Sequence, residues 1–300
     1  MEETIKVRVD CQVGCGYAIA QHGELFQGVV QEDNGSIHRC LLSLPFPGMA
    51  SSATFEFKAN QELFVSPSHK IKALKAAKIT AEMLGVWPLE GALILKSNIP
   101  EAKGYGSSTA DCTAAVLAVA DACGTTLRPE EVAALVVKAE VASGNIMFAN
   151  PVLLAHREGK VLEYYPHKLP NLAVLGFDME QEGYVDTLLF PLAKYSPHEI
   201  IYLRRLRLEL RRALITQDVR LLGAVATASA ELNEKFLPKL RFADVRRVAM
   251  SVDAAGVSVA HSGTVGAILF DPNGECEARI EKASKKLAAC GIKNSLRFDL

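Results

Sequence analysis

The stretch from Pro100 to Ala110 constrains this chain more than any other. It reads Pro-Glu-Ala-Lys-Gly-Tyr-Gly-Ser-Ser-Thr-Ala and follows an apolar, strand-like run at residues 91–97. Behind it lies an Ala-rich segment, residues 110–123, which has the composition of a buried helix and is ended by Gly124. The sequence therefore predicts a strand, a glycine turn and a helix in direct succession.

Such a unit offers two kinds of hydrogen-bond donor to an anion. Its glycines, Gly104 and Gly106, let the main chain approach a ligand closely. The hydroxyl residues Ser107, Ser108 and Thr109 add their side chains at a helix N-terminus, which favours phosphate. The stretch is not a Walker A loop, because no Gly-Lys-Ser/Thr follows four variable residues after a glycine. A turn that only caps a buried helix remains the alternative on these residues alone.

Composition excludes several classes of protein. Three hundred residues form one large or two modest domains, and a net charge of −1 gives no reason to expect nucleic acid or an anionic membrane as a partner. The longest apolar runs are far shorter than the roughly 20 residues of a membrane span, and the charged N-terminus lacks a signal-peptide core. None of the seven cysteines forms a Cys-x-x-Cys pair, so we expect neither a zinc site nor a disulfide framework, and a reducing cytoplasm.

Two further glycine-bearing segments lie far from the first. Residues 21–28 read Gln-His-Gly-Glu-Leu-Phe-Gln-Gly, which on its own is typical of a turn between strands with His22 as a solvated turn residue. Residues 256–271 read as strand, glycine turn and strand, with His261 incidental to the turn.

These three segments, in this order, resemble the motifs of the GHMP kinases, the superfamily of galactokinase, homoserine kinase, mevalonate kinase and phosphomevalonate kinase. The long form of the loop at residues 103–111, the Gly-Glu-Leu-Phe-Gln-Gly at 23–28 and the His-Ser-Gly-Thr-Val at 261–265 look most like the L-threonine kinase branch, which serves cobamide (vitamin B12) synthesis. The resemblance covers most of the chain.

The fold implied by this resemblance is α+β, the GHMP kinase fold. It has an N-terminal domain like the second domain of ribosomal protein S5 and a ferredoxin-like C-terminal domain, with ATP in the crevice between them. Composition changes at the Pro-His-Lys-Leu-Pro run of residues 166–170, where we place the boundary between domains 1–167 and 168–300.

Local patterns predict the other elements of this fold. The remaining strands are expected at residues 4–9, 41–44, 53–58, 172–177 and 295–299. The remaining helices are expected at residues 70–84, 129–140, 198–215, 218–233, 242–255 and 277–290. The Arg-rich helix at 198–215 has leucines at helical spacing, so we expect a charged outer face rather than an anion-binding patch.

The resemblance also implies a set of nucleotide-binding residues. ATP phosphates would be bound by the two glycine turns, at Gly104, Tyr105, Gly106, Ser107, Ser108, Thr109, Ser262 and Gly263. Mg2+ would be held by Ser108 and Glu140, a ligand pair that is chemically sufficient because Mg2+ takes its other ligands from phosphates and water. Lys103 would neutralise charge during transfer. From the residues alone, Glu140 is an exposed acid at a helix end and Lys103 a solvated loop lysine.

One departure from the family pattern concerns the catalytic base. Many GHMP kinases have an Asp where this chain has Gly144 and Asn145. Glu24, Gln27 and Asn145 are the candidates for the acceptor pocket, and Asn145 is also a catalytic candidate with Lys103 and Ser108. The protein either works by positioning alone, as homoserine kinases do, or binds ATP without catalysis as a regulatory protein.

The expected activity is phosphorylation of the side-chain hydroxyl of a small amino acid. L-Threonine is the first choice of acceptor, and L-serine, homoserine or another small alcohol are the alternatives. The pocket residues that decide between them are not recognisable in the sequence, and the oligomeric state stays open.

Overall fold

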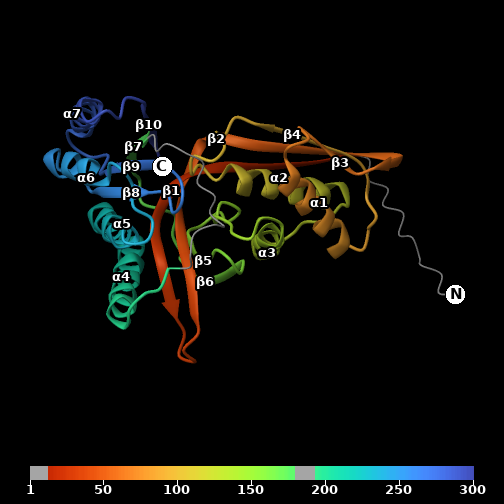
Figure 1. Cartoon of the computed structure of the whole chain (residues 1–300), viewed down its shortest axis with the longest axis horizontal. Coiled ribbons are helices and arrows are strands. Elements are labelled where there is room, and N and C mark those ends of the chain that lie inside the picture. Colours follow the sequence, from red (N-terminus) through yellow and green to blue (C-terminus); the bar gives the residue numbers. More distant parts are fainter. Residues whose placement is uncertain (1–12, 180–192) are drawn as a thin grey trace.

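The computed structural model describes residues 13–179 and 193–300. Its sheet is built around two long consecutive strands. Strand β1 (Val13–Gln31) and strand β2 (Ile37–Glu62) pair as a long antiparallel hairpin. The hairpin bends near its middle, so that it contributes to both ends of an elongated molecule (Figure 1). Register shifts between Ile19 and Phe26 interrupt the ladder. Such bulges bend a strand and change the direction of its side chains.

Eight shorter strands complete a single sheet within the described residues. They are β3 (Phe64–Ser66), β4 (Glu90–Ser97), β5 (Val152–Ala155), β6 (Lys160–Tyr164), β7 (Ala173–Asp178), β8 (Gly256–Val259), β9 (Val265–Phe270) and β10 (Ser295–Asp299). The strand order is β10-β7-β9-β8-β1-β2-β4-β3, and the hairpin β5–β6 is joined to β2 through β5. The sheet is antiparallel except for the pairing of β3 with β4.

Seven helices cover this sheet in the described ranges. They are α1 (Ile71–Met83), α2 (Ser107–Ala122), α3 (Pro129–Glu140), α4 (Pro197–Thr216), α5 (Val219–Asn233), α6 (Phe242–Ser251) and α7 (Cys276–Ala289). Helices α1 to α3 lie together beside one arm of the bent hairpin, α4 and α5 lie beside the other arm, and α6 and α7 lie next to β7 and β8 (Figure 1). Over the same ranges, none of the seven is both long and apolar enough to cross a membrane.

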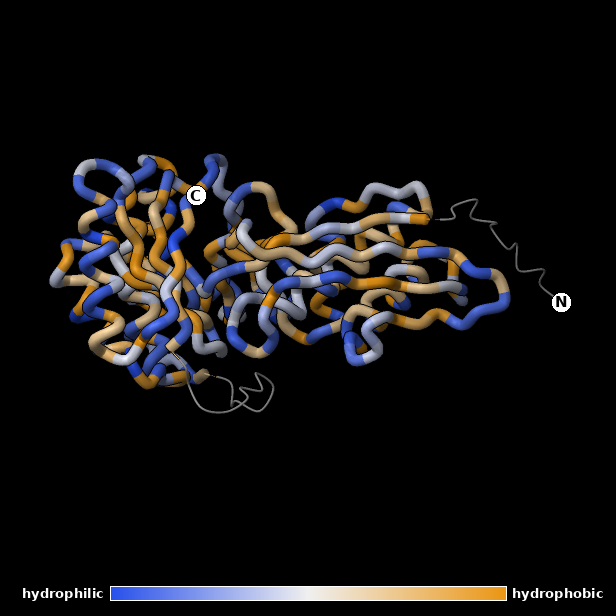
Figure 2. Tube along the Cα trace, turned by 90° about the horizontal axis from the view of Figure 1, so that it is seen from above, coloured by the Kyte–Doolittle hydropathy of each residue, from blue (hydrophilic) through white to orange (hydrophobic). Residues whose placement is uncertain are grey.

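Each group of helices buries its own apolar core against the sheet. The small residues of α2 pack with α1 and α3 against β2 and β4, and Phe55 and Leu93 are fully buried there. Helices α4 and α5 cover the other end of β1 and β2, while α6 and α7 pack against β7, β8 and β9. The hydropathy colouring follows this division, with hydrophobic strand segments inside and hydrophilic loops at the periphery (Figure 2).

Helix α4 shows why the local patterns were informative. Ser196 and Glu199 form a capping box, in which the Ser196 hydroxyl accepts the Glu199 N–H at 3.3 Å and the Glu199 carboxylate accepts the Ser196 N–H at 2.7 Å. Leu203, Leu206 and Leu210 are buried, so the arginines occupy the outer face as predicted.

Several predictions about local structure need correction. Residues 21–28 lie within β1 rather than in a turn, and His22 is fully buried instead of solvated. The strands expected at 41–44 and 53–58 are parts of the single strand β2, and the helix expected to reach Ala255 ends at Ser251. The strand expected at residues 4–9 lies outside the described residues. The proposed domain boundary falls in the loop between β6 and β7 and stays a prediction.

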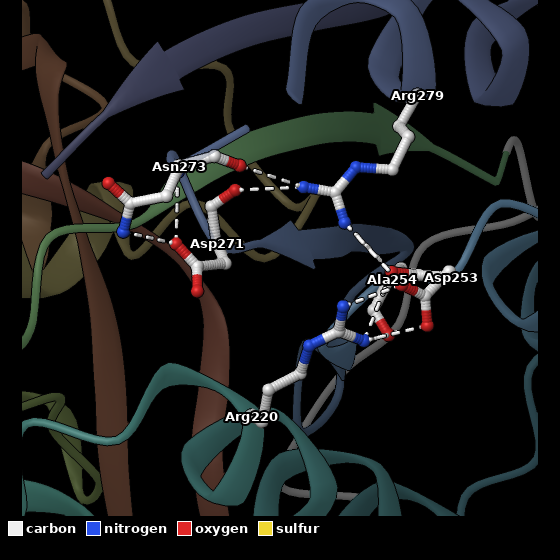
Figure 3. Close-up of polar contacts among 6 residues, drawn as sticks. All are labelled: Arg220, Asp253, Ala254, Asp271, Asn273 and Arg279. Carbon is white, nitrogen blue, oxygen red and sulfur yellow. Dashed lines mark hydrogen bonds and ion pairs between the residues drawn. The ribbon is translucent and has the colours of Figure 1, made fainter. Parts of the chain in front are cut away.

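A polar network ties the helices of the C-terminal half together (Figure 3). Arg220 of α5 donates to the Asp253 carboxylate at 2.6 and 2.9 Å, and Asp253 lies in the turn between α6 and β8. Arg279 of α7 donates to the carbonyls of Asp253, Asp271 and Asn273, each at 3.2 Å. Both arginines thus hold the loops at one end of β8 and β9, and the opposite end of those strands carries the second glycine turn.

Candidate active site

The predicted glycine loop connects β4 to α2. Helix α2 begins at Ser107, three residues earlier than expected, with Gly106 as its N-cap in the left-handed region at φ +69°. Gly104 has φ +101°, and a Cβ there would stand 2.7 Å from the Cβ of Ala260. No side chain fits at this position, because the loop packs directly against the end of β8.

The second glycine turn, between β8 and β9, is in backbone contact with the first. The N–H groups of Thr264 and Val265 donate to the Lys103 carbonyl at 2.8 and 3.1 Å. A Cβ on Gly263 would stand only 2.3 Å from the Cα of Gly104. Two motifs that are far apart in the sequence therefore form one continuous surface of main-chain atoms.

The N-terminus of α2 opens onto this surface. A helix leaves its first N–H groups without intrahelical partners and carries partial positive charge there, which favours phosphate. Ser108 lies in this first turn, and its buried hydroxyl has no hydrogen-bond partner within the described part of the chain. An unsatisfied buried hydroxyl at a helix N-terminus is suited to a phosphate or a metal ion.

Glu140 lies beside this hydroxyl, at the end of α3. It is buried, not exposed as its position at a helix end had predicted, and it accepts the Thr109 hydroxyl at 2.7 Å. Burial raises the pKa of Glu140 to about 7, against the opposing effect of the hydroxyls of Ser108 and Thr109. A buried carboxyl next to an unsatisfied hydroxyl fits Mg2+, which takes one or two protein oxygens and completes its shell with phosphates and water. Among the described residues, no cluster of three or more His, Cys, Asp or Glu forms a metal site of another kind.

A cavity of about 660 Å³ connects these groups. Its lining includes the predicted residues Glu24, Gly104, Gly106, Ser107, Ser108, Thr109, Glu140, Ser262 and Gly263. Nine of the predicted site residues therefore face one space, and this volume is in the range of pockets for a cofactor-sized ligand.

Glu24 lines the cavity from the bulged part of β1. It is buried, its Oε1 accepts the Gln21 side-chain amide at 2.8 Å, and its Oε2 has no partner in the described structure. Burial raises the pKa of Glu24 to about 8, although the nearby Ser43 hydroxyl and the Gln21 amide act to lower it. Glu24 is therefore mainly a neutral acid at pH 7.

Comparison with known proteins identifies the architecture. The family model described as the GHMP kinases N terminal domain matches residues 71–150. The L-threonine kinase of Salmonella typhimurium is 30% identical over 204 residues, which is 67% of this chain and 67% of that protein. The chain belongs to the GHMP kinase family.

Other GHMP kinases agree with this assignment. The L-threonine kinase of Citrobacter freundii is 31% identical over 180 residues, 60% of this chain and 62% of that protein, so less than two thirds of that relative is matched. The crystal structure of homoserine kinase from Cytophaga hutchinsonii superimposes with a TM-score of 0.69 at 15% identity, covering 96% of this chain and 94% of that one. The predicted α+β GHMP kinase fold is confirmed. Membership places the chain among phosphotransferases with an alcohol acceptor.

Four predicted site residues of this GHMP kinase lie outside the cavity lining. Lys103 directs its ammonium to the Asp178 carboxylate at 2.8 Å. Tyr105 is buried and packs its ring edge-on against His22 at 5.1 Å, in an aromatic cluster. In this structure the Lys103 ammonium is thus paired with Asp178 and the Tyr105 ring lies in the core, and the roles expected for these two loop residues stay predictions.

Asn145 and Gln27 are the other two. The Asn145 side chain accepts the Ser43 N–H at 3.2 Å and donates to the Val152 carbonyl at 2.8 Å, so both of its amide atoms are used by backbone. Gln27 is buried farther along β1, with its side-chain amide unpartnered within the described structure. Asn145 therefore joins β2 to β5 through these two hydrogen bonds. The cavity is lined by its neighbour Gly144, and Asn145 itself is not part of the lining.

The structure adds cavity residues that the sequence did not identify. Lys70 and Asp111 form an ion pair of 2.7 Å at the wall of the cavity. His156 and His261 line the same space with ring centroids 5.3 Å apart, so His261 is not incidental to its turn. Burial lowers the pKa of His156 to about 3 and that of His261 to about 4, and both are neutral at pH 7. Asp111 and His261 lie inside two of the segments that resemble the family's motifs, but no role at the site was expected for any of these four residues.

Proposed function

We propose that this GHMP kinase is an ATP- and Mg2+-dependent enzyme that phosphorylates the side-chain hydroxyl of a small amino acid. L-Threonine is the proposed acceptor and O-phospho-L-threonine the product, for use in cobamide synthesis in the cytoplasm. One observation carries the activity: both glycine turns and the Ser108–Glu140 pair face one cavity. The choice of L-threonine is supported by the two L-threonine kinases to which the chain is similar.

The phosphate end of the cavity performs binding and charge stabilisation. Backbone N–H groups at Gly106 to Ser108, and the turn at Ser262 and Gly263, would hold the phosphates. Ser108 and Glu140 would hold Mg2+, which when bound neutralises negative charge on the phosphates. Thr109 keeps the Glu140 carboxylate in place through its 2.7 Å hydrogen bond.

The acceptor end would orient the hydroxyl without a dedicated carboxylate base. Gly144 lines the cavity where many family members have an Asp, and the Asn145 amide is occupied by backbone. A loose phosphoryl-transfer transition state needs mainly alignment of the attacking oxygen with the γ-phosphorus. Glu24 is the proposed acceptor contact, because it is a polar side chain of the cavity with one oxygen unpartnered in the described structure.

The missing Asp also supports a second candidate function. A protein that binds ATP without transferring phosphate, and acts as a regulator, would retain the glycine turns and lack the base. A kinase for L-serine, homoserine or another small alcohol is a variant of the first proposal.

Mg2+-dependent ADP release distinguishes these functions. The assay supplies ATP with L-threonine, L-serine, L-homoserine or ethanolamine, and we expect the largest response with L-threonine. A larger response to another compound would keep the kinase and change its acceptor. ATP binding without ADP release from any of the four would contradict amino-acid kinase activity and favour the regulator.

A further inference from the structure

Lys70 lies across the opening of the first glycine loop. Its ammonium is 2.7 Å from the Asp111 carboxylate and 2.6 Å from that of Glu101, and all three residues line the cavity. Glu101 precedes the glycines of the loop, and Asp111 follows them in the second turn of α2. The ammonium thus lies between the two ends of the loop proposed to hold the phosphates.

We propose that Lys70 is the cation that binds the phosphates of ATP in this cavity, and that Glu101 occupies its ammonium until the nucleotide binds. The assignment rests on the proposed function of the site as an ATP site. It gives the role expected for Lys103 to a residue 33 positions earlier in the chain.

The two carboxylates hold Lys70 very differently. Asp111 is buried, and its second oxygen accepts the Ser51 hydroxyl at 2.6 Å, so this partner is fixed. The Glu101 side chain is 55% exposed, and its other contact is His69, whose side chain is 61% exposed. An exposed ion pair is screened by water and contributes little. A polyphosphate can therefore replace Glu101 while Asp111 keeps the ammonium in place.

Lys70 remains charged in this environment. Burial acts to lower its pKa, but the hydrogen bonds with Asp111 and Glu101 outweigh that effect, and the pKa of Lys70 is raised. A Lys ammonium binds phosphate as a compact charge with three donors, two of which are used here by carboxylates.

The other lysines near the loop are less suited to this role. Lys103 is paired with Asp178 outside the cavity lining. Lys72 lines the cavity from the first turn of α1, but it is exposed and, among the described residues, no ion pair fixes its position. Lys70 combines a place in the lining with a buried anchor.

Calorimetric binding of MgATP and of adenosine tests this assignment without requiring turnover. Lys70→Met should weaken MgATP binding about 10- to 100-fold, the worth of a hydrogen bond to a charged group, and leave adenosine binding within about twofold. Lys70→Arg should weaken MgATP binding less than Lys70→Met does, because it keeps the positive charge. Glu101→Gln should strengthen MgATP binding, because the competing carboxylate is gone. Lys75→Met removes the same charge from an exposed position of α1 and serves as the control.

Three outcomes would overturn the proposal. MgATP binding by Lys70→Met within about twofold of wild type would remove Lys70 from the phosphate site and leave the proposed function intact. Unchanged or weaker MgATP binding by Glu101→Gln would show that Glu101 does not compete for the ammonium. Because this variant keeps the buried Lys70–Asp111 pair, it remains a test even if Lys70→Met does not fold. Wild-type protein that fails to bind MgATP would contradict the proposed function itself, and the assignment with it.

Discussion

Thr109 and Glu140 join the first turn of α2 to the last residue of α3 through a buried hydrogen bond of 2.7 Å. The bond fixes a carboxylate beside Ser108, whose own buried hydroxyl has no partner in the described structure. Neighbouring hydroxyls thus have separate tasks: Thr109 positions the carboxylate, and Ser108 is left for a ligand.

Replacing Ser108 by Ala should lower kcat by at least tenfold and change the melting temperature by no more than about 2 °C. Within the described residues the Ser108 hydroxyl has no hydrogen-bond partner of ordinary geometry, so its removal should cost little stability, whereas a lost metal or phosphate contact acts on turnover. ADP release over a range of Mg2+ concentrations and a thermal melt measure the two effects. Thr109→Val is the matched control, since it should lose about 1 kcal/mol of stability as well as activity. If the yield of folded Ser108→Ala protein falls as much as its turnover, Ser108 serves only to stabilise the N-terminus of α2.

Asn145→Ala should destabilise the protein by about 2–4 kcal/mol, because it leaves the Ser43 N–H and the Val152 carbonyl without a partner. The fraction that remains folded should keep most of its kcat, since the amide does not reach the cavity lining. Urea unfolding measures the stability, and kcat calculated per folded molecule measures the activity. If kcat falls by a factor of 100 while stability is unchanged, Asn145 is catalytic after all.

Asn145→Asp tests whether the missing acid can be restored at this position. A carboxylate cannot donate to the Val152 carbonyl, so the substitution brings two acceptors together in a buried place. We expect lower stability and no gain in kcat over the range pH 6–9. A gain in kcat would indicate that residue 145 can face the acceptor hydroxyl.

Glycine turns and caps were recognisable in the sequence because their chemistry is local. The loop at residues 100–110 needs glycines whatever surrounds it. The start of α3 is predicted by Pro129 at its first position and by two acidic residues in its first turn. The same logic located α4 and the strand–turn–strand unit that became β8 and β9.

Side-chain partners were not recognisable, because they come from distant parts of the chain. Lys103 looked suited to phosphate until the fold placed Asp178 next to it, 75 positions later. Nothing in the sequence distinguishes Lys70 from the other lysines of residues 70–84, and its proximity to Asp111 is visible only in the fold. Glu140 looked exposed because the packing of α3 beside the loop cannot be inferred from the period of a helix.

Acid should destabilise the protein partly through His22. Burial lowers the pKa of His22 from 6.5 to about 4, so between these pH values the unfolded chain binds a proton that the folded chain does not. His22 therefore leaves the unfolding free energy unaffected by pH above 6.5 and lowers it progressively as the pH falls to 4. The decrease is about 3 kcal/mol at 1.36 kcal/mol per pKa unit.

His22→Leu should therefore make the unfolding free energy depend less steeply on pH between 4 and 6.5. The slope is the informative quantity, because repacking against Phe46 and Phe298 shifts the free energy equally at every pH. Urea unfolding at four pH values gives the slope, with His167→Gln as an exposed control. An unchanged slope in His22→Leu would mean that His22 has the same pKa in the folded protein as in the unfolded chain.

Gly263→Ala should separate the two glycine turns. Its Cβ would stand 2.3 Å from the Gly104 Cα and 2.4 Å from the Lys103 carbonyl oxygen, and both are main-chain atoms that cannot rotate away. We expect a loss of about 1–3 kcal/mol in stability from overpacking and a rise in KM for ATP larger than that for the amino acid. Gly274→Ala is the control, because it introduces a left-handed alanine with no neighbour within 4 Å among the described residues and should change stability without changing KM. Equal changes in the two KM values for Gly263→Ala would show that contact between the turns supports the whole cavity rather than the phosphate end.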